Sequence, residues 1–185
     1  MRALQKPGSS SDPGAAVGQG RGRRRAHAGG HRPKVTLKEL VGSGDRIILG
    51  TLPAAVVGVI LNVAYPSFFE VGGPSDALRE FSLVVLIPGV TIWLWSAVLI
   101  LRKVPRGELI TVGPFAIVKH PLYTSVALLV LPWVGFLANT WLGALIGIVL
   151  YVVSRRVAPE EEARLAETFG HAWAEYCDAV KLPWL

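Results

Sequence analysis

The chain has 185 residues, of which 51% are hydrophobic, and its mean hydropathy is +0.45. This composition is too apolar for an ordinary soluble domain, and the length is too short for several domains. The net charge of +6 comes from residues 1–45, which hold nine Lys or Arg and three Asp or Glu, whereas residues 46–185 hold ten of each sign. A single cysteine, Cys177, excludes an intramolecular disulfide framework and gives no zinc pattern, so no metal site is predicted.

Residues 1–45 are predicted to form a disordered basic arm that approaches the membrane, followed by a membrane domain at residues 46–185. Up to about Pro33 the segment has almost no large apolar residue, so it cannot bury enough surface to offset its ordering entropy. The basic run from Arg21 to Arg25 is compatible with binding to nucleic acid or anionic lipid. A cytoplasmic arm that biases membrane topology is the preferred interpretation, and no nucleic-acid partner is expected.

Two apolar segments follow, at residues 47–64 and 81–101, and both are predicted to cross the membrane. At ~1.5 Å per residue, the first approaches and the second reaches the ~30 Å thickness of the hydrocarbon layer. Residues 65–80 between them are expected to form a loop. The amide of Asn62 is expected to bond to a neighbouring helix, which is the commoner role for a lone amide in a membrane segment.

A third apolar stretch, residues 122–153, contains no formal charge. As one helix it would extend ~48 Å, well beyond the hydrocarbon layer. A turn at Asn139 and Thr140 is therefore predicted, which makes the stretch a short helical hairpin with arms of about 15 residues.

The positive-inside rule supports this division. With four transmembrane helices, every basic loop and both termini lie on the cytoplasmic side. An unbroken third helix would instead place Arg155 and Arg156 on the opposite side from Lys119. The predicted fold class is therefore all-α and integral to the membrane, with about four transmembrane helices and both termini cytoplasmic.

The last segment has the pattern of an amphipathic helix. Pro159 in the first turn, followed by the carboxylates of residues 160–162, favours a helix start here. Apolar residues then recur every three or four positions, at Leu165, Phe169, Trp173, Tyr176 and Val180. We expect a C-terminal helix that lies at the cytoplasmic interface and covers another part of the protein, with Gly170 as a candidate interruption.

Charged residues that could carry chemistry gather on the cytoplasmic side, around Lys119 and His120 and around residues 155–162. The four apolar segments contain no carboxylate, which disfavours a transporter or pump. No nucleophile elbow frames a serine, and there is no phosphate-binding glycine loop. These absences exclude several common enzyme classes.

Two blocks of residues in a fixed order carry a resemblance to a known family. The first runs from Leu109 to Phe115 and continues from Lys119 to Tyr123; the second includes Glu161, Glu162, Leu165, Phe169, Gly170, Trp173, Tyr176 and Val180. With a hairpin between the blocks, residues 82–185 resemble the isoprenylcysteine carboxyl methyltransferase family, and also its relatives among the phospholipid methyltransferases.

The resemblance implies a membrane enzyme that transfers a methyl group from S-adenosylmethionine, without a Rossmann fold, to a lipid-like or prenylated acceptor. The cofactor-binding residues that it implies are Leu109, Ile110, Phe115, Lys119, His120, Pro121, Leu122, Tyr123, Glu161 and Glu162. His120 and Arg156 are the catalytic candidates. Arg156 would orient an acceptor carboxylate, with Arg155 or a register using Glu160 as alternatives, and His120 would act as the base for an amine acceptor.

The sequence departs from the family pattern at three points. Lys119 stands where the family usually has Arg, which keeps the cation but loses the bidentate fork. Gly107 lies where many relatives carry His. The second apolar segment lacks the Gly-x-Gly of the phosphatidylethanolamine branch, which favours a carboxylate as the acceptor.

Three other functions are compatible with the sequence. They are N-methylation of a phospholipid amine, an NADPH-dependent reduction of the sterol-reductase type, and a non-catalytic membrane role. The sequence makes no prediction of oligomeric state.

Overall fold

The computed structural model describes residues 37–73 and 75–182, and predictions about the basic arm up to residue 36 lie outside them. The described elements all belong to one compact unit of the chain, residues 32–185. They are helices joined by short connections, with two isolated β-bridges and no strand among the described residues, so the all-α prediction is confirmed. The helices longer than one turn are α1 (Leu37–Ala64), α3 (Asp76–Lys103), α4 (Pro121–Ser125), the π-helical η3 (Val126–Val130), α5 (Leu131–Leu137), α6 (Leu142–Phe169) and α7 (His171–Ala179).

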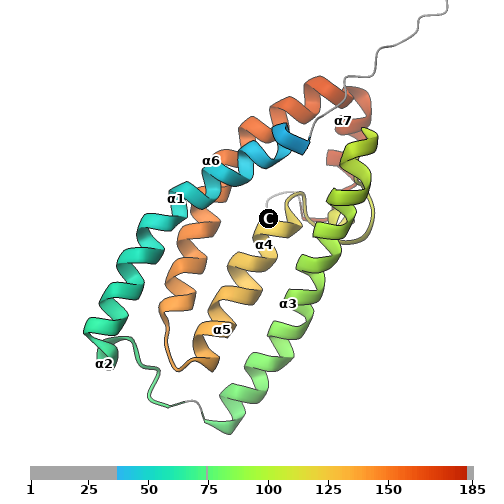
Figure 1. The fold of residues 1–185 in the computed structure, drawn as a ribbon. Helices are drawn as coiled ribbons and strands as arrows, with labels where there is room; N and C mark the ends of the chain where they lie inside the picture. Colours follow the sequence, from blue (N-terminus) through green and yellow to red (C-terminus); the bar gives the residue numbers. More distant parts are fainter. Residues whose placement is uncertain (1–36, 74, 183–185) are drawn as a thin grey trace, which may run out of the picture. The chain divides into compact units, whose positions relative to one another are not determined.

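Three helices are long and apolar enough to cross a membrane, by length and composition (Figure 1). They are the part of α1 at Gly44–Ala64, α3 with the turn that follows it at Asp76–Arg106, and α6 at Leu142–Phe169. Many of their large apolar side chains are exposed, including Val63 at 75% and Val84 at 66%. Exposure of such an apolar surface to water is unfavourable, whereas lipid chains can cover it. The protein is therefore an integral membrane protein.

The predicted hairpin is present. Its first arm, Pro121–Leu137, consists of α4, η3 and α5 and is shorter than the three long helices. Its turn contains Asn139, whose φ of 56° is a left-handed conformation that asparagine tolerates. The second arm, α6, returns against the first, and a Cβ on Gly143 would lie only 2.1 Å from the carbonyl oxygen of Leu131. This close approach between the two arms therefore requires a glycine.

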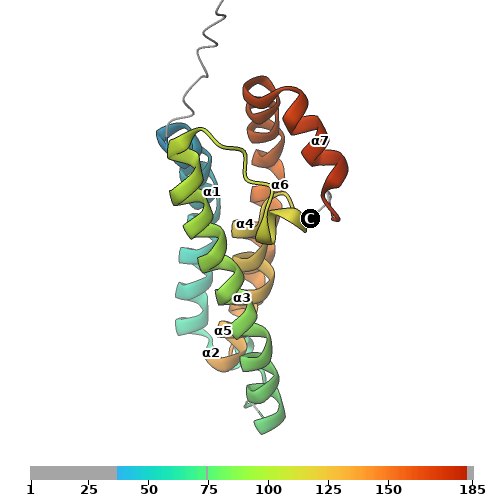
Figure 2. The same cartoon turned by 90° about the vertical axis from the view of Figure 1, so that its right-hand side faces the viewer.

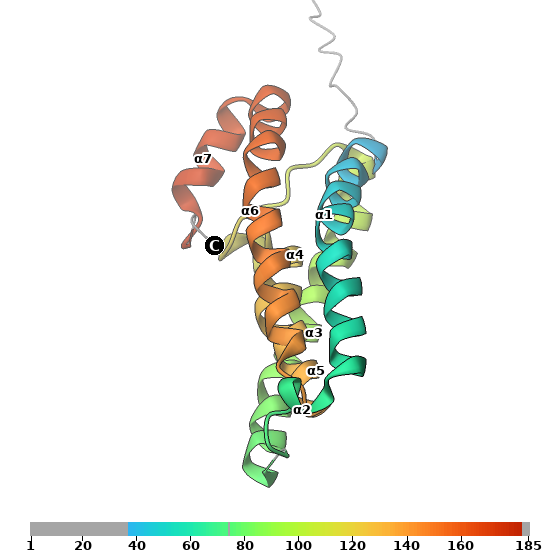
Figure 3. The same cartoon turned by 90° about the vertical axis from the view of Figure 1, so that its left-hand side faces the viewer.

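The remaining long helices flank the hairpin. The first, α1, packs along α6, and α3 packs against α4, η3 and α5 (Figures 1 and 3). Asn62 was predicted to bond to a neighbouring helix; its amide does bond to another segment, because Thr140 Oγ1 donates to Asn62 Oδ1 at 2.8 Å, but Thr140 lies in the turn of the hairpin and not in a helix. This bond joins the end of α1 to the turn of the hairpin.

The predicted loop at residues 65–80 is shorter than expected. It contains the single turn α2 (Pro66–Phe69), and α3 already begins at Asp76. Ser75 caps α3, since its hydroxyl accepts a hydrogen bond from the Leu78 amide at 3.2 Å. The Trp141 indole donates to the Phe68 carbonyl at 2.9 Å, which fastens this loop to the hairpin turn.

The prediction that a new helix starts near Pro159 is wrong. The prediction that the second arm of the hairpin is short is also wrong. The helix α6 runs without interruption from Leu142 through Pro159 to Phe169. Pro159 removes the hydrogen bond to the Arg155 carbonyl, but Arg155 is exposed, so solvent can satisfy that oxygen. Packing against α1 and an ion pair between Arg46 and Glu160 support α6 on both sides of the proline. The break occurs at Gly170 instead, where α7 begins.

Candidate active site

The segment between α3 and α4 builds one side of the site. After the turn η1 (Val104–Arg106), Gly107 adopts a left-handed φ of 67°, and a second turn, η2 (Gly113–Ala116), follows. Pro121 then occupies the first turn of α4, which fixes the direction of the chain after His120. These turn-forming residues keep the segment as an irregular connection at one end of the helices.

The last helix, α7, folds back onto this segment (Figure 2). Tyr176 Oη donates to the Phe115 carbonyl at 2.8 Å, and the Leu182 amide donates to the Ile117 carbonyl at 2.8 Å. Trp173, Tyr176 and Val180 are buried together. Partly buried apolar residues from the segment, from α6 and from α7 pack against this core: Leu109, Leu165, Phe169 and Cys177.

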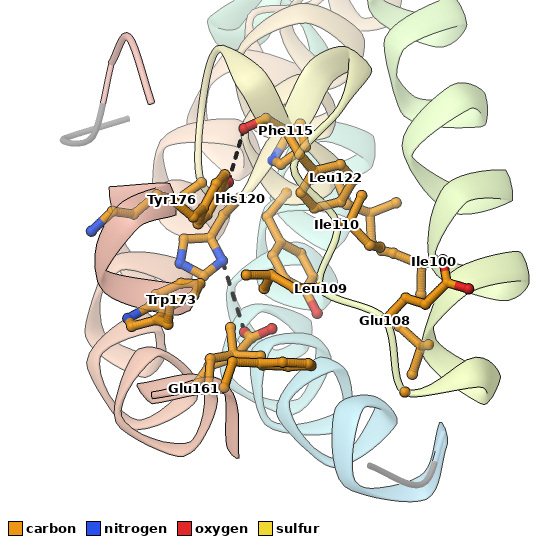
Figure 4. A pocket seen from close by; sticks show the side chains of 17 residues that line it. Ile100, Glu108, Leu109, Ile110, Phe115, His120, Leu122, Glu161, Trp173 and Tyr176 are labelled. Carbon is orange, nitrogen blue, oxygen red and sulfur yellow. Dashed lines mark hydrogen bonds and ion pairs between the residues drawn. The ribbon is translucent and has the colours of Figure 1, made fainter. Parts of the chain in front are cut away.

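A pocket lies between the connecting segment, α4 and the ends of α3, α6 and α7 (Figure 4). Its empty space is about 750 Å³, a figure that includes space open to solvent. The lining residues are Ile100, Val104, Gly107, Glu108, Leu109, Ile110, Phe115, Lys119, His120, Pro121, Leu122, Tyr123, Glu161, Leu165, Phe169, Trp173 and Tyr176.

Both nitrogens of the His120 ring face carboxylates. Nδ1 lies 3.9 Å from Glu161 Oε2, and Nε2 lies 3.3 Å from Glu162 Oε1. The other oxygen of Glu162 accepts a hydrogen bond from Lys119 Nζ at 2.9 Å. Lys119 Nζ also lies 5.9 Å from the centre of the Trp173 ring. One network therefore connects α6, the connecting segment and α7 beside the pocket.

The structure brings most of the predicted site residues together. Every one of the predicted cofactor-binding residues lines the pocket except Glu162, which contacts Lys119 and His120. Arg156 and its alternative Arg155 are exposed and do not line the pocket. Arg156 precedes Glu161 by five residues and Arg155 precedes it by six. At these spacings, the two arginine side chains point away from the face of α6 that carries Glu161.

Other pocket residues were missed or interpreted differently. Leu165, Phe169, Trp173 and Tyr176 form the wall of the pocket, so the part of the protein that the apolar stripe was predicted to cover is the pocket itself. The helical spacing of these four residues was the signal in the sequence that could have identified them as pocket residues. Ile100, Val104 and Glu108 line the other side, and no spacing in the sequence distinguishes them from the rest of α3 and its turn.

The environment of the pocket is partly desolvated. The side chains of Lys119 and His120 are 12% and 11% exposed. Burial raises the pKa of the Tyr176 phenol, and the neighbouring Cys177 and Glu162 raise it further. The phenol thus stays protonated and donates to Phe115 at physiological pH. No cluster of metal-binding side chains occurs within residues 37–73 and 75–182.

The described part of the chain is thus an all-helical membrane protein with a partly polar pocket at the ends of its helices. Residues 83–167 match the model of the isoprenylcysteine carboxyl methyltransferase (ICMT) family, which confirms the resemblance over that segment. The match includes α6 up to Glu167 but neither α1 nor α7. Comparison with curated proteins and with solved structures gave no match.

Proposed function

We propose that this protein transfers a methyl group from S-adenosylmethionine to a carboxylate of a membrane-embedded acceptor, either isoprenylcysteine-like or another lipid. The observation that carries this proposal is the common location of both family blocks. Glu161 lines the same pocket as eight residues of the first block, from which the helical hairpin separates it: Leu109, Ile110, Phe115, Lys119, His120, Pro121, Leu122 and Tyr123.

The pocket has the chemistry that this cofactor requires. Its apolar and aromatic walls suit the adenine ring, and the carboxylate of Glu161 suits an amino or hydroxyl donor. Lys119 supplies a cation in the same pocket for the carboxylate of the amino-acid part. The donor set therefore fits a cationic nucleoside with an amino-acid tail.

A bound sulfonium cofactor supplies a methyl group that is already activated for transfer. The protein's task is to exclude water and to align the acceptor with this methyl group. Leu109, Ile110 and Phe115 provide apolar surface around the transfer site, while Glu161 holds the polar part of the ligand. Such catalysis by positioning requires no metal ion.

The position of His120 favours a carboxylate acceptor over an amine. An amine must lose a proton to be methylated, and the general base must reach that proton directly or through one water molecule. Both His120 nitrogens face Glu161 or Glu162, so the ring has no nitrogen directed only at the open pocket. An acceptor carboxylate is already nucleophilic at neutral pH and needs no base. His120 is accordingly proposed to orient Glu161.

Arg156 has a more limited role in this proposal than the family pattern implies. Its side chain is exposed outside the pocket. It can therefore meet an acceptor headgroup only at the surface of α6. Mutation of Arg156 should raise the KM for the acceptor without changing the affinity for the cofactor.

The proposed topology has both termini and the pocket on the cytoplasmic side. The basic residues after α3 and within α6 support this orientation by the positive-inside rule. Reporter fusions at the two termini and at Gly72 in the opposite loop test it. Accessibility of both termini from outside the cytoplasm would contradict it.

The binding test uses purified full-length protein in detergent and S-adenosylhomocysteine as the probe. We expect saturable binding that Glu161→Ala or His120→Ala abolishes, while Glu175→Gln, on the exposed side of α7, leaves it intact. Thermal protection by NADPH without protection by S-adenosylhomocysteine would favour a reductase instead. Lipid extracts incubated with methyl-labelled cofactor and resolved by mass would identify the acceptor.

A further inference from the structure

We propose that α7 is a hinged lid over the pocket, that Gly170 is its hinge, and that Tyr176 is a positioning residue which latches it closed. The inference rests on the proposed function for the identity of the ligand, a nucleoside with an amino-acid tail. The lid itself is inferred from the geometry of α7. Residues 171–179 lie outside the segment that matches the methyltransferase family.

The pocket is closed on one side by α7. Trp173 and Tyr176 line the pocket, and both are buried. A ligand that fills the space between α7 and the connecting segment would contact both. Movement of α7 away from the segment would therefore open this side of the pocket and allow exchange.

The junction between α6 and α7 has the properties of a hinge. Gly170 has φ 52° and ψ −119°, a combination that residues with a side chain rarely adopt. A Cβ at Gly170 would meet no atom within 4 Å, so no neighbouring side chain packs against the junction at this point. Hinges in proteins are commonly a few residues at the end of an element that absorb a large change in backbone angles.

The closed position is held by a few specific contacts. Tyr176 donates to the Phe115 carbonyl at 2.8 Å, and the Leu182 amide donates to the Ile117 carbonyl. Lys119, fixed by Glu162, lies over the Trp173 ring. Phe115 and Lys119 line the pocket and also hold the lid, so ligand binding and closure should stabilise each other.

The single cysteine of the chain provides a reporter of lid opening. Cys177 is partly buried on α7, packed against the core formed by Trp173, Tyr176 and Val180. When α7 moves away, this thiol becomes accessible to a maleimide. The rate of labelling of the native protein therefore measures the open fraction, without any engineered cysteine.

The experiment measures maleimide labelling of Cys177 in full-length protein in detergent. Tyr176→Phe removes the latch, and we expect labelling about threefold to tenfold faster, the range for loss of one hydrogen bond of this kind. Gly170→Ala should also accelerate labelling, because the closed geometry strains a residue with a Cβ. Glu175→Gln, on the exposed side of the same helix, should label at the wild-type rate.

S-Adenosylhomocysteine should slow labelling of the wild type, and this protection should be weaker in Tyr176→Phe. Equal labelling rates in the wild type, Tyr176→Phe and Gly170→Ala would show that α7 is a fixed wall, and would overturn the lid. Absence of protection, with the variant rates still different, would instead reject the proposed cofactor and keep the lid. Unchanged helical circular dichroism in each variant excludes global unfolding as the cause.

Discussion

Glu162 of α6 accepts a hydrogen bond from Lys119 at 2.9 Å and does not line the pocket, whereas its neighbour Glu161 lines the pocket. Adjacent residues on a helix point about 100° apart, so the two carboxylates meet different surroundings although both lie near the His120 ring. The structure therefore separates the acidic pair into one residue that faces the pocket and one that binds residues of its wall.

Glu161→Gln should weaken binding of S-adenosylhomocysteine by ~10-fold to ~100-fold, the cost of losing a hydrogen bond to a charged group. Isothermal titration in detergent measures this directly. Glu160→Gln is the matched control, since Glu160 pairs with Arg46 on the exposed surface and does not line the pocket. Equal affinities of Glu161→Gln and the wild type would show that Glu161 does not contact the ligand.

Lys119→Met should destabilise the protein by about 1–3 kcal/mol, because it removes one of the two side chains that bind the partly buried Glu162 carboxylate. Lys119→Arg should retain the wild-type stability, since the cation remains and the guanidinium can also stack on Trp173. Thermal unfolding in detergent, monitored by circular dichroism, provides the comparison. If Lys119→Met were as stable as Lys119→Arg, the ion pair would not support the fold.

His120→Asn should reduce kcat/KM mainly through a higher KM for the cofactor, with kcat within about tenfold of the wild type. This follows if His120 positions Glu161 and does not remove a proton from the acceptor. Steady-state kinetics with the acceptor identified from lipid extracts separate the two parameters. A loss of more than about a hundredfold in kcat at unchanged cofactor affinity would instead indicate a general base.

The stability of the wild type should fall relative to Tyr176→Phe as the pH rises above ~10, the ordinary pKa of tyrosine. Burial raises the pKa of the Tyr176 phenol in the folded protein. Its contribution to stability is therefore fully present below the pKa of the unfolded chain and is lost as the pH rises towards the folded value. Thermal midpoints of both proteins between pH 7 and pH 11 would test this; parallel curves would contradict it.

Gly143→Val should prevent the hairpin from closing. Its new Cβ would lie 2.1 Å from the Leu131 carbonyl oxygen, a backbone atom that cannot move without separating α5 from α6. Gly50→Ala is the control, because its Cβ would meet Val153 Cγ1, a side-chain methyl that can rotate away. The yield of monodisperse protein after size-exclusion chromatography should fall sharply for Gly143→Val and remain near wild type for Gly50→Ala.

The sequence by itself determined the fold class and the location of the site. Runs of apolar residues of bilayer length predict membrane helices, and the uncharged stretch at residues 122–153 requires a turn, which Asn139 provides. The residues of the two family blocks are recognisable from their order alone. The periodic spacing of Leu165, Phe169, Trp173 and Tyr176 also predicted a covering surface.

Tertiary structure alone decided which residues face the pocket. Whether Pro159 begins a helix or lies inside one depends on the packing of α6 against α1, which no local pattern encodes. The distinction between Glu161 and Glu162 depends on where Lys119 and His120 lie in space, more than forty residues away along the chain. Helical spacing and composition are local properties of the sequence, whereas a pocket is formed by contacts between distant segments.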